Sequence, residues 1–173
     1  MRIIITMGAA GVGKSTVGQA LATALGWEFR DGDDFHPPTN VSKMTASQPL
    51  NDQDRAPWLD TLHQFVHQQL LTDQPTIVAA SLLKERYRQR VIHGREQSIA
   101  IIYLHADFTT LQQRLQQRSA HFMKAELLRS QLADLEPPPP NRALWVNAAQ
   151  PVPEIVNGIV EHYNLPTTGT ETG

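Results

Sequence analysis

The sequence predicts an α/β fold in which a five-stranded parallel β-sheet is covered by helices on both faces. Short apolar, β-branched runs recur along the chain, helical patterns lie between them, and a glycine-rich turn follows the first run. Continuous apolar runs are typical of strands buried on both faces, and strands that alternate with helices are typical of parallel sheets. The length of 173 residues fits one domain.

The elements follow in chain order. The predicted strands are Ile3–Ile5, Trp27–Arg30, Thr76–Ala80, Ile99–Leu104 and a weaker Ala143–Val146. The first helix follows the glycine-rich turn, and Gly26 is placed to end it. Two further helices are predicted from apolar residues that share one face: Trp58, Leu62, Phe65 and Val66 in one, and Phe108, Leu111 and Leu115, after an Asp107 N-cap, in the other.

Two stretches depart from this alternation and are interpreted as excursions from the sheet. Residues 31–53 are polar and interrupted by prolines, and residues 119–136 form a short helical piece with few apolar anchors. The four prolines at 137–140 are interpreted as a stiff connector, with a partner-docking motif as the alternative. The small, polar residues 166–173 are predicted to be a disordered tail.

Composition excludes several classes of function. The chain has no cysteine, so disulfides, thiolate metal sites and cysteine nucleophiles are excluded. The net charge of −2 argues against binding to nucleic acid as a bulk polyanion. No apolar run approaches the length of a membrane span or of a signal-peptide core. We therefore expect a cytoplasmic protein without nucleic-acid or membrane partners.

The segment Gly8–Ser15 fits the phosphate-binding pattern G-x-x-x-x-G-K-[ST] between the first strand and the first helix. Glycines let backbone N–H groups turn inward around an anion, and the helix N-terminus adds its positive dipole end. Lys14 then supplies a point charge for the terminal phosphates, and Ser15 supplies a hydroxyl to Mg²⁺. The residues predicted to bind the nucleotide are Gly8, Ala9, Ala10, Gly11, Val12, Gly13, Lys14, Ser15 and Thr16.

Acidic residues follow the second predicted strand, in the segment Asp31–His36. Carboxylates at the carboxyl end of a parallel strand face the ligand crevice, where they can orient an acceptor hydroxyl, take its proton or hold Mg²⁺ through water. The alternative is a solvated turn, since Asp and Gly are turn residues. His36 is a candidate substrate ligand or a plain loop residue.

Three further side chains, Arg55, Lys84 and Arg88, are candidates around the acceptor. Asp54 is expected to be an N-cap, and Arg55 lies in the same first helical turn, where the dipole disfavours a cation. Arg55 is therefore a candidate for a bidentate grip on an anionic substrate. Lys84 and Arg88 have i, i+4 spacing after the third strand, and we interpret them as substrate ligands or as surface charges.

Arg114 and Arg118 also have i, i+4 spacing, and they precede the second excursion. Cations at a helix end beside a mobile segment suit a lid that closes over nucleotide phosphates. The alternative role for Arg118 is to pair with the helix dipole.

The motifs together resemble the gluconokinase family. The resemblance rests on Gly8–Ser15, on the DGD-x-x-HP segment from Asp31, and on the PLND-x-DR-x-PWL segment from Pro49 to Leu59. It continues in order through Asn40–Met44, Ser81–Lys84, Tyr87–Arg88, His121–Phe122, Leu128, Gln131 and Leu135–Glu136. Ala10 and Leu82 depart from residues that are usual in the family; the first costs a hydroxyl but no backbone donor.

The resemblance implies a single domain over residues 1–165, similar in fold to shikimate and adenylate kinases, with an acceptor-binding region at about 31–75 and a lid at about 119–135. It implies a cytoplasmic, often homodimeric enzyme that uses ATP and Mg²⁺ to phosphorylate D-gluconate on its 6-hydroxyl. By position, Asp31 resembles the family's metal-side carboxylate and Asp33 its acceptor-hydroxyl carboxylate. Together with the residue patterns above, this leads us to expect the following roles: catalysis by Lys14, Asp33 and Arg118, nucleotide contact by Arg114 and Arg118, metal binding by Ser15 and Asp31, and substrate binding by Asp33, His36, Arg55, Lys84, Arg88 and His121.

Two rival functions stay open on the sequence. One is a kinase of the same fold that acts on shikimate, a nucleoside monophosphate or another aldonic acid. The absence of a Gly-Gly pair argues against a shikimate kinase. The other is a nucleotide-binding sensor without transfer activity, against which the set of Asp33, Arg55 and Lys84 argues.

Overall fold

The computed structural model describes residues 1–46, 48–118 and 124–168. In that part of the chain, five parallel strands form one sheet in the order β2-β3-β1-β4-β5. The strands are β1 (Ile3–Met7), β2 (Glu28–Asp31), β3 (Thr76–Ala79), β4 (Ile99–His105) and β5 (Leu144–Asn147). The predicted sheet is thus confirmed, with strand ends shifted by one or two residues.

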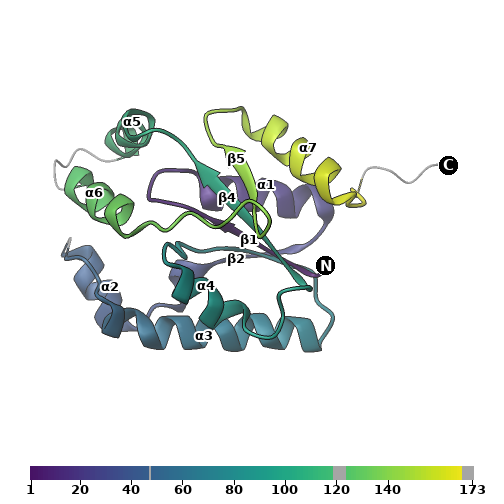
Figure 1. Ribbon diagram of the computed structural model, residues 1–173, viewed down its shortest axis with the longest axis horizontal. Coiled ribbons are helices and arrows are strands. Elements are labelled where there is room, and N and C mark those ends of the chain that lie inside the picture. Colours follow the sequence, from purple (N-terminus) through teal and green to yellow (C-terminus); the bar gives the residue numbers. More distant parts are fainter. Residues whose placement is uncertain (47, 119–123, 169–173) are drawn as a thin grey trace.

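Alternate residues of β1 face two separate apolar cores. Ile4 packs into the core that α1 (Lys14–Leu25) and α7 (Val152–Tyr163) cover. Ile3 and Ile5 pack into the core that α3 (Asp52–Leu71) and α4 (Glu85–Ile92) cover. Figure 1 shows the two helix pairs on opposite sides of the sheet. Because every residue of β1 is buried, the strand carries an unbroken apolar run, as expected for the centre of a parallel sheet.

The predicted end of the first helix is confirmed. Gly26 adopts a left-handed conformation with φ 68°, and its backbone N–H bonds to the carbonyls of Ala22 and Thr23. A residue with a side chain would be strained in this conformation, so glycine ends the helix at low cost.

The two predicted excursions contain short helices. The first holds the 3₁₀ turn η1 (Gly32–Phe35) and α2 (Pro38–Thr45), and the second holds α6 (Lys124–Asp134), which follows α5 (Phe108–Arg118). Figure 1 shows α2 and α6 at the same end of the molecule, on the left of the view. Two separate helical segments, α2 and α6, therefore lie near the carboxyl ends of the strands.

The start of α3 corrects one expectation. Asn51, not Asp54, is the N-cap: its side chain accepts a hydrogen bond from the Asp54 backbone N–H at 2.9 Å. Asp54 is the third helical residue, and its carboxylate accepts in return from the Asn51 backbone N–H at 3.0 Å. This reciprocal capping box satisfies two orphan N–H groups and leaves one Asp54 oxygen for Lys43, at 2.6 Å.

The last segments are held by specific bonds. Trp145 on β5 donates its indole N–H to the carbonyl of Pro138 at 3.0 Å, which ties the proline connector to the edge of the sheet. The backbone N–H of Thr168 donates to the Ala24 carbonyl at 3.0 Å, so the beginning of the predicted tail lies against α1; residues 169–173 are outside the described part. Among the helices that the structure describes, none has the length and apolar character needed to cross a membrane.

Candidate active site

A cavity of about 320 Å³ lies at the carboxyl ends of the strands, between the glycine-rich loop, η1, α2, α3 and α6. Nine predicted site residues line it: Ala10, Gly11, Gly13, Lys14, Ser15, Thr16, Asp33, His36 and Arg55. Ser81, which follows β3, lines it as well. The topology explains this convergence, because the carboxyl ends of parallel strands meet at one edge of the sheet. Segments far apart in the sequence thereby share one cavity.

The glycine-rich loop has the backbone conformation of an anion cradle. Gly8 has φ 143°, and a Cβ added there would lie 2.4 Å from the Leu104 carbonyl oxygen. Gly13 has φ 99° and immediately precedes α1, so the N-terminus of this helix, where Lys14, Ser15 and Thr16 line the cavity, meets any anion bound there. The Thr6 hydroxyl donates to the Lys14 carbonyl at 3.1 Å and fixes the loop to β1. The cradle is therefore preformed by backbone.

The two predicted metal ligands are in direct contact. The Ser15 hydroxyl donates to Asp31 Oδ2 at 2.6 Å, while Asp31 Oδ1 accepts from the backbone N–H of Asp33 at 3.0 Å. Two hard oxygen atoms beside a phosphate cradle suit Mg²⁺, which typically takes one or two protein oxygens and fills its other positions with water and phosphate. The donor set thus fits the metal that the sequence suggests.

Asp33, on η1, is one of the residues that line the cavity. The surrounding protein raises the pKa of its carboxyl, and the negative charges of Asp31 and Asp34 add to this effect, while Lys14 opposes it. Its side chain still has 66% of its surface exposed, because it faces the open cavity. A carboxylate whose proton affinity is raised, and which a ligand can reach, suits general-base chemistry.

His36 forms a flat wall beside Asp33. Its ring stacks on Trp58 at 4.6 Å between centroids, with 14° between the planes. Burial and the positive charge of Arg55 lower the pKa of His36 to about 4, so the ring is neutral at physiological pH. Trp58 is itself held by its indole N–H, which donates to the Gly32 carbonyl at 2.7 Å.

Arg55 enters the cavity from the first turn of α3. Its Nε donates to the Leu50 carbonyl at 3.3 Å, and its guanidinium lies 5.6 Å from the centre of the Tyr87 ring. These contacts hold the side chain without a carboxylate partner among the described ion pairs. The guanidinium is therefore positioned to meet an anion that enters the cavity.

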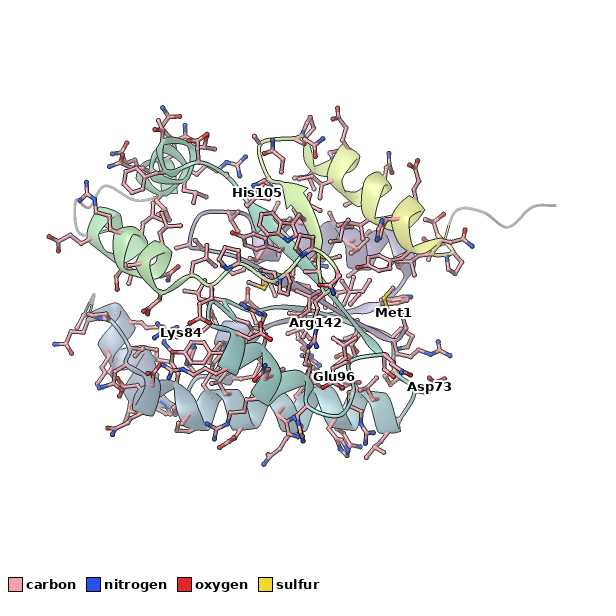
Figure 2. The ribbon with its side chains drawn as sticks, in the orientation of Figure 1. Met1, Asp73, Lys84, Glu96, His105 and Arg142 are labelled. Carbon is pink, nitrogen blue, oxygen red and sulfur yellow. The ribbon has the colours of Figure 1, made fainter. Side chains whose placement is uncertain are left out.

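Lys84 lies beside the cavity but does not line it. Its ammonium pairs with Asp52 at the start of α3, at 3.4 Å, and with Asp134 at the end of α6, at 3.2 Å. Figure 2 shows Lys84 between these two helices. Asp52 also accepts from Arg86 and from the Tyr87 hydroxyl. Lys84 thus links the start of α3 to the end of α6.

Arg88 corrects another expectation, because it is a structural residue. Only 2% of its surface is exposed, and its guanidinium donates to the carbonyls of Leu82 and Leu83 and to Glu85. It does not line the cavity. The i, i+4 spacing was misleading because Lys84 is the extended N-cap residue of α4, so the two side chains do not share a helix face.

The predicted nucleotide ligand Arg114 lies behind the loop, on α5. Its guanidinium donates to the carbonyls of Val12, at 3.3 Å, and Ala148, at 2.7 Å. A second hollow of about 220 Å³ adjoins it and shares Gly11, Gly13 and Thr16 with the cavity. Arg114 thus lines this second hollow and not the main cavity. The Arg118 side chain and His121 lie outside the described residues.

Gln131 on α6 is a site residue that the residue patterns did not single out. Its side-chain oxygen accepts from the backbone N–H of Ala10 at 2.7 Å, which joins α6 to the glycine-rich loop. The two residues are far apart in sequence, so no local spacing signals the contact. The family resemblance was the one sequence signal that included Gln131.

Comparisons with known proteins agree with this geometry. The family model described as AAA domain (AAA_33) matches residues 3–138. The gluconokinase of Gluconobacter oxydans is 41% identical over 165 residues, which cover 94% of this chain and 91% of that protein.

Solved structures give the same result. A gluconokinase from Sinorhizobium meliloti has a TM-score of 0.79 at 37% identity, covering 93% of this chain and 94% of that one. An unliganded sugar kinase from Janibacter has a TM-score of 0.87 at 32% identity, covering 95% of each chain. A shikimate kinase from Acinetobacter baumannii shares the fold alone, at 16% identity and a TM-score of 0.61, covering 95% and 93%. By its loop, its cavity and these likenesses, the chain belongs to the gluconokinase family of P-loop kinases.

Proposed function

We propose that the protein transfers the terminal phosphoryl group of ATP to the 6-hydroxyl of D-gluconate, forming 6-phosphogluconate and ADP. One observation carries the proposal: a carboxylate of raised proton affinity, Asp33, shares a single cavity with the phosphate cradle around Lys14. In-line phosphoryl transfer needs an oriented acceptor hydroxyl facing bound phosphates, and this cavity brings those requirements together.

Asp33 orients the 6-hydroxyl and accepts its proton as the bond to phosphorus forms. Its raised pKa makes it a better base than an ordinary aspartate. Lys14 and the N–H groups of the loop stabilise the charge on the transferring phosphoryl group. Arg118 is proposed to add a second positive charge from the end of α5.

The other end of gluconate is a carboxylate, which we assign to Arg55. The guanidinium lies on the same cavity wall as Asp33, and a fork of N–H donors matches a carboxylate better than a point charge does. His36 and, from the lid, His121 are proposed to contact the hydroxyl-bearing carbons between the two ends. Lys84 is assigned a supporting role, because its ammonium already pairs with two carboxylates.

Ser15 and Asp31 are proposed to hold Mg²⁺ beside the cradle. When bound, the metal neutralises phosphate charge and helps to align the terminal phosphates. Arg114 is proposed to support the nucleotide through its contact with the Val12 carbonyl. Apolar side chains, including Leu127 of α6 and Leu50 before α3, line the same cavity and would exclude water when the lid is closed.

A coupled assay of ADP release tests the proposal across gluconate, shikimate, AMP and a panel of other sugar acids. We expect turnover with gluconate to exceed that with every other acceptor. Faster turnover with another acceptor would identify that acceptor as the substrate and contradict the proposal. ATP binding without turnover on any acceptor would indicate the nucleotide sensor instead. The fold-level likeness to a shikimate kinase is too distant in sequence to favour shikimate.

We also infer that the enzyme works in the cytoplasm as a homodimer, which follows from its family membership. Light scattering on the purified protein tests the dimer, and a mass equal to one chain would contradict it. Fractionation of the source cells tests the location.

A further inference from the structure

Asn40, on α2, is a buried polar residue on a helix that is otherwise largely exposed. Only 2% of its surface is accessible, whereas its neighbour Val41 is 46% exposed. A buried amide must satisfy its hydrogen bonds within the protein. The Asn40 amide nitrogen lies 2.7 Å from the Asp54 backbone carbonyl and 3.2 Å from Nδ1 of His36. The side chain therefore joins the first turn of α3 to the histidine of the cavity wall.

The partners of Asn40 determine which nitrogen of His36 carries the proton. A backbone carbonyl only accepts, so the Asn40 side chain must turn its NH₂ group, not its oxygen, toward Asp54. The same NH₂ group then donates its second hydrogen to Nδ1 of His36. Nδ1 must accept, so in the neutral ring the proton lies on Nε2. The lowered pKa of His36, about 4, is consistent with a ring that stays neutral.

The ring is also fixed in direction. It stacks on Trp58, which is anchored to the Gly32 carbonyl, so the imidazole cannot turn freely. Its Nε2 atom lies 3.9 Å from Asp33 Oδ1. That separation is too long for a direct hydrogen bond, but a hydroxyl oxygen placed beside both atoms can reach each of them at an ordinary length of about 2.7–2.9 Å.

We propose that Asn40 is a positioning residue that fixes His36 as the Nε2–H tautomer, so that His36 donates to the same substrate hydroxyl whose proton Asp33 accepts. The inference rests on the proposed transfer to a hydroxyl at Asp33. A hydroxyl oxygen has one hydrogen and two lone pairs. With its hydrogen on Asp33 and one lone pair on His36, the remaining lone pair has a defined direction for attack on phosphorus.

With the opposite tautomer of His36, the direction of the attacking lone pair would no longer be defined. Nε2 of His36 would then be an acceptor, and it would compete with Asp33 for the single hydroxyl proton. The hydroxyl would lose a donor and gain a second possible orientation. Asn40 thus acts on the reaction only through His36.

The first measurement needs no substrate and is made on the wild-type enzyme, with one variant used only for assignment. Nitrogen-15 NMR of the wild-type enzyme, labelled at histidine and assigned with a His36→Gln variant, reports which ring nitrogen is protonated. We expect His36 to be the Nε2–H form near neutral pH. A predominant Nδ1–H form would overturn the proposal whatever acceptor the enzyme uses.

The second measurement is kinetic. Asn40→Ala removes the donor to Nδ1 and should lower kcat by about tenfold, the size of one lost hydrogen bond, with little change in KM for ATP. In the His36→Gln background the same change should have little further effect on kcat, because its target is gone. Asn157→Ala, an exposed asparagine on α7, is the matched control and should leave kcat unchanged.

Two kinetic outcomes would contradict the proposal: an unchanged kcat in Asn40→Ala, or a full additional loss in the His36→Gln background. If wild-type enzyme fails to phosphorylate gluconate but shows the Nε2–H tautomer, the substrate assignment fails and the tautomer assignment stands. Melting temperatures of all variants separate loss of positioning from loss of fold.

Discussion

The two halves of the cavity are built in different ways. The phosphate half comes from one continuous segment, Gly8–Thr16, and most of its donors are backbone N–H groups at the start of α1. The acceptor half comes from side chains on η1, α2, α3 and α6, which the chain brings together from distant positions. Asp33, His36 and Arg55 each depend on neighbours from another element for their direction or their charge.

The difference predicts where each half tolerates change. Backbone donors persist under most substitutions, as long as the glycines keep their conformations. The acceptor half depends on the identity of individual side chains, so its variants should separate binding of the acceptor from binding of ATP. The four predictions below probe the two halves of the cavity one side chain at a time.

Replacing Lys14 by alanine should have the largest effect. It removes the charge that faces the terminal phosphates, and losing one such stabilising group typically costs about 10²–10³ in rate. We expect at least this loss in kcat/KM by the coupled assay. Arg30→Ala, a surface cation on β2, is the control. If Lys14→Ala turns over at close to the wild-type rate, the proposed role of Lys14 in transfer is wrong.

Asp33→Asn should stop transfer and leave the phosphate half intact. The amide cannot take the proton of the acceptor hydroxyl, so kcat should fall on the order of 10²-fold, while ATP affinity measured by calorimetry stays unchanged. Asp34→Asn, which alters the next residue outside the cavity, should have a much smaller effect. An unaltered kcat in Asp33→Asn would refute the assignment of the base.

The buried histidine of the acceptor half should make stability depend on pH. The pKa of His36 is lowered from 6.5 to about 4 in the folded protein, so between these values the unfolded chain binds more protons. The stability that depends on a neutral His36 is fully present above pH 6.5 and is lost as the pH falls to about 4. This loss lowers the free energy of unfolding by about 3 kcal/mol.

Urea unfolding at pH 7, 5 and 4 measures this change as the difference between the wild type and His36→Gln. Other titrating groups largely cancel in the difference. A pH-independent difference would show that His36 titrates normally in the folded state.

Arg55→Ala should have the smallest effect, confined to the acceptor. Loss of a charge-assisted contact with the gluconate carboxylate is worth about 10- to 100-fold in KM for gluconate. The KM for ATP should stay the same. Arg90→Ala, an exposed arginine paired with Asp60, is the matched control. If the KM for ATP rises and the KM for gluconate does not, Arg55 contacts ATP and the assignment to gluconate is wrong.

Much of the fold was predictable because it depends on local patterns. The predicted second strand, Trp27–Arg30, lies one residue before the observed β2, and Gly26 ends α1 as expected. The start of α3 was misassigned because Asn51 and Asp54 are both good capping residues, and only their mutual bonds show which is the N-cap.

The acceptor half was less predictable, because spacing does not reveal burial. Arg88 matched the pattern of a substrate ligand, but its guanidinium is used to satisfy two backbone carbonyls in the interior. Asn40 and Gln131 showed no functional signal of their own, since each acts through a partner that only folding brings near.

The sequence by itself determined the class of fold, the phosphate cradle and the family, because these depend on consecutive residues and on strand ends that meet at one sheet edge. Only the tertiary structure decided which acceptor-side cations reach the cavity, which tie helices together, and how His36 is held. The physical reason is that the direction, partners and charge state of a side chain depend on its surroundings in space, and those surroundings come from segments distant in the chain.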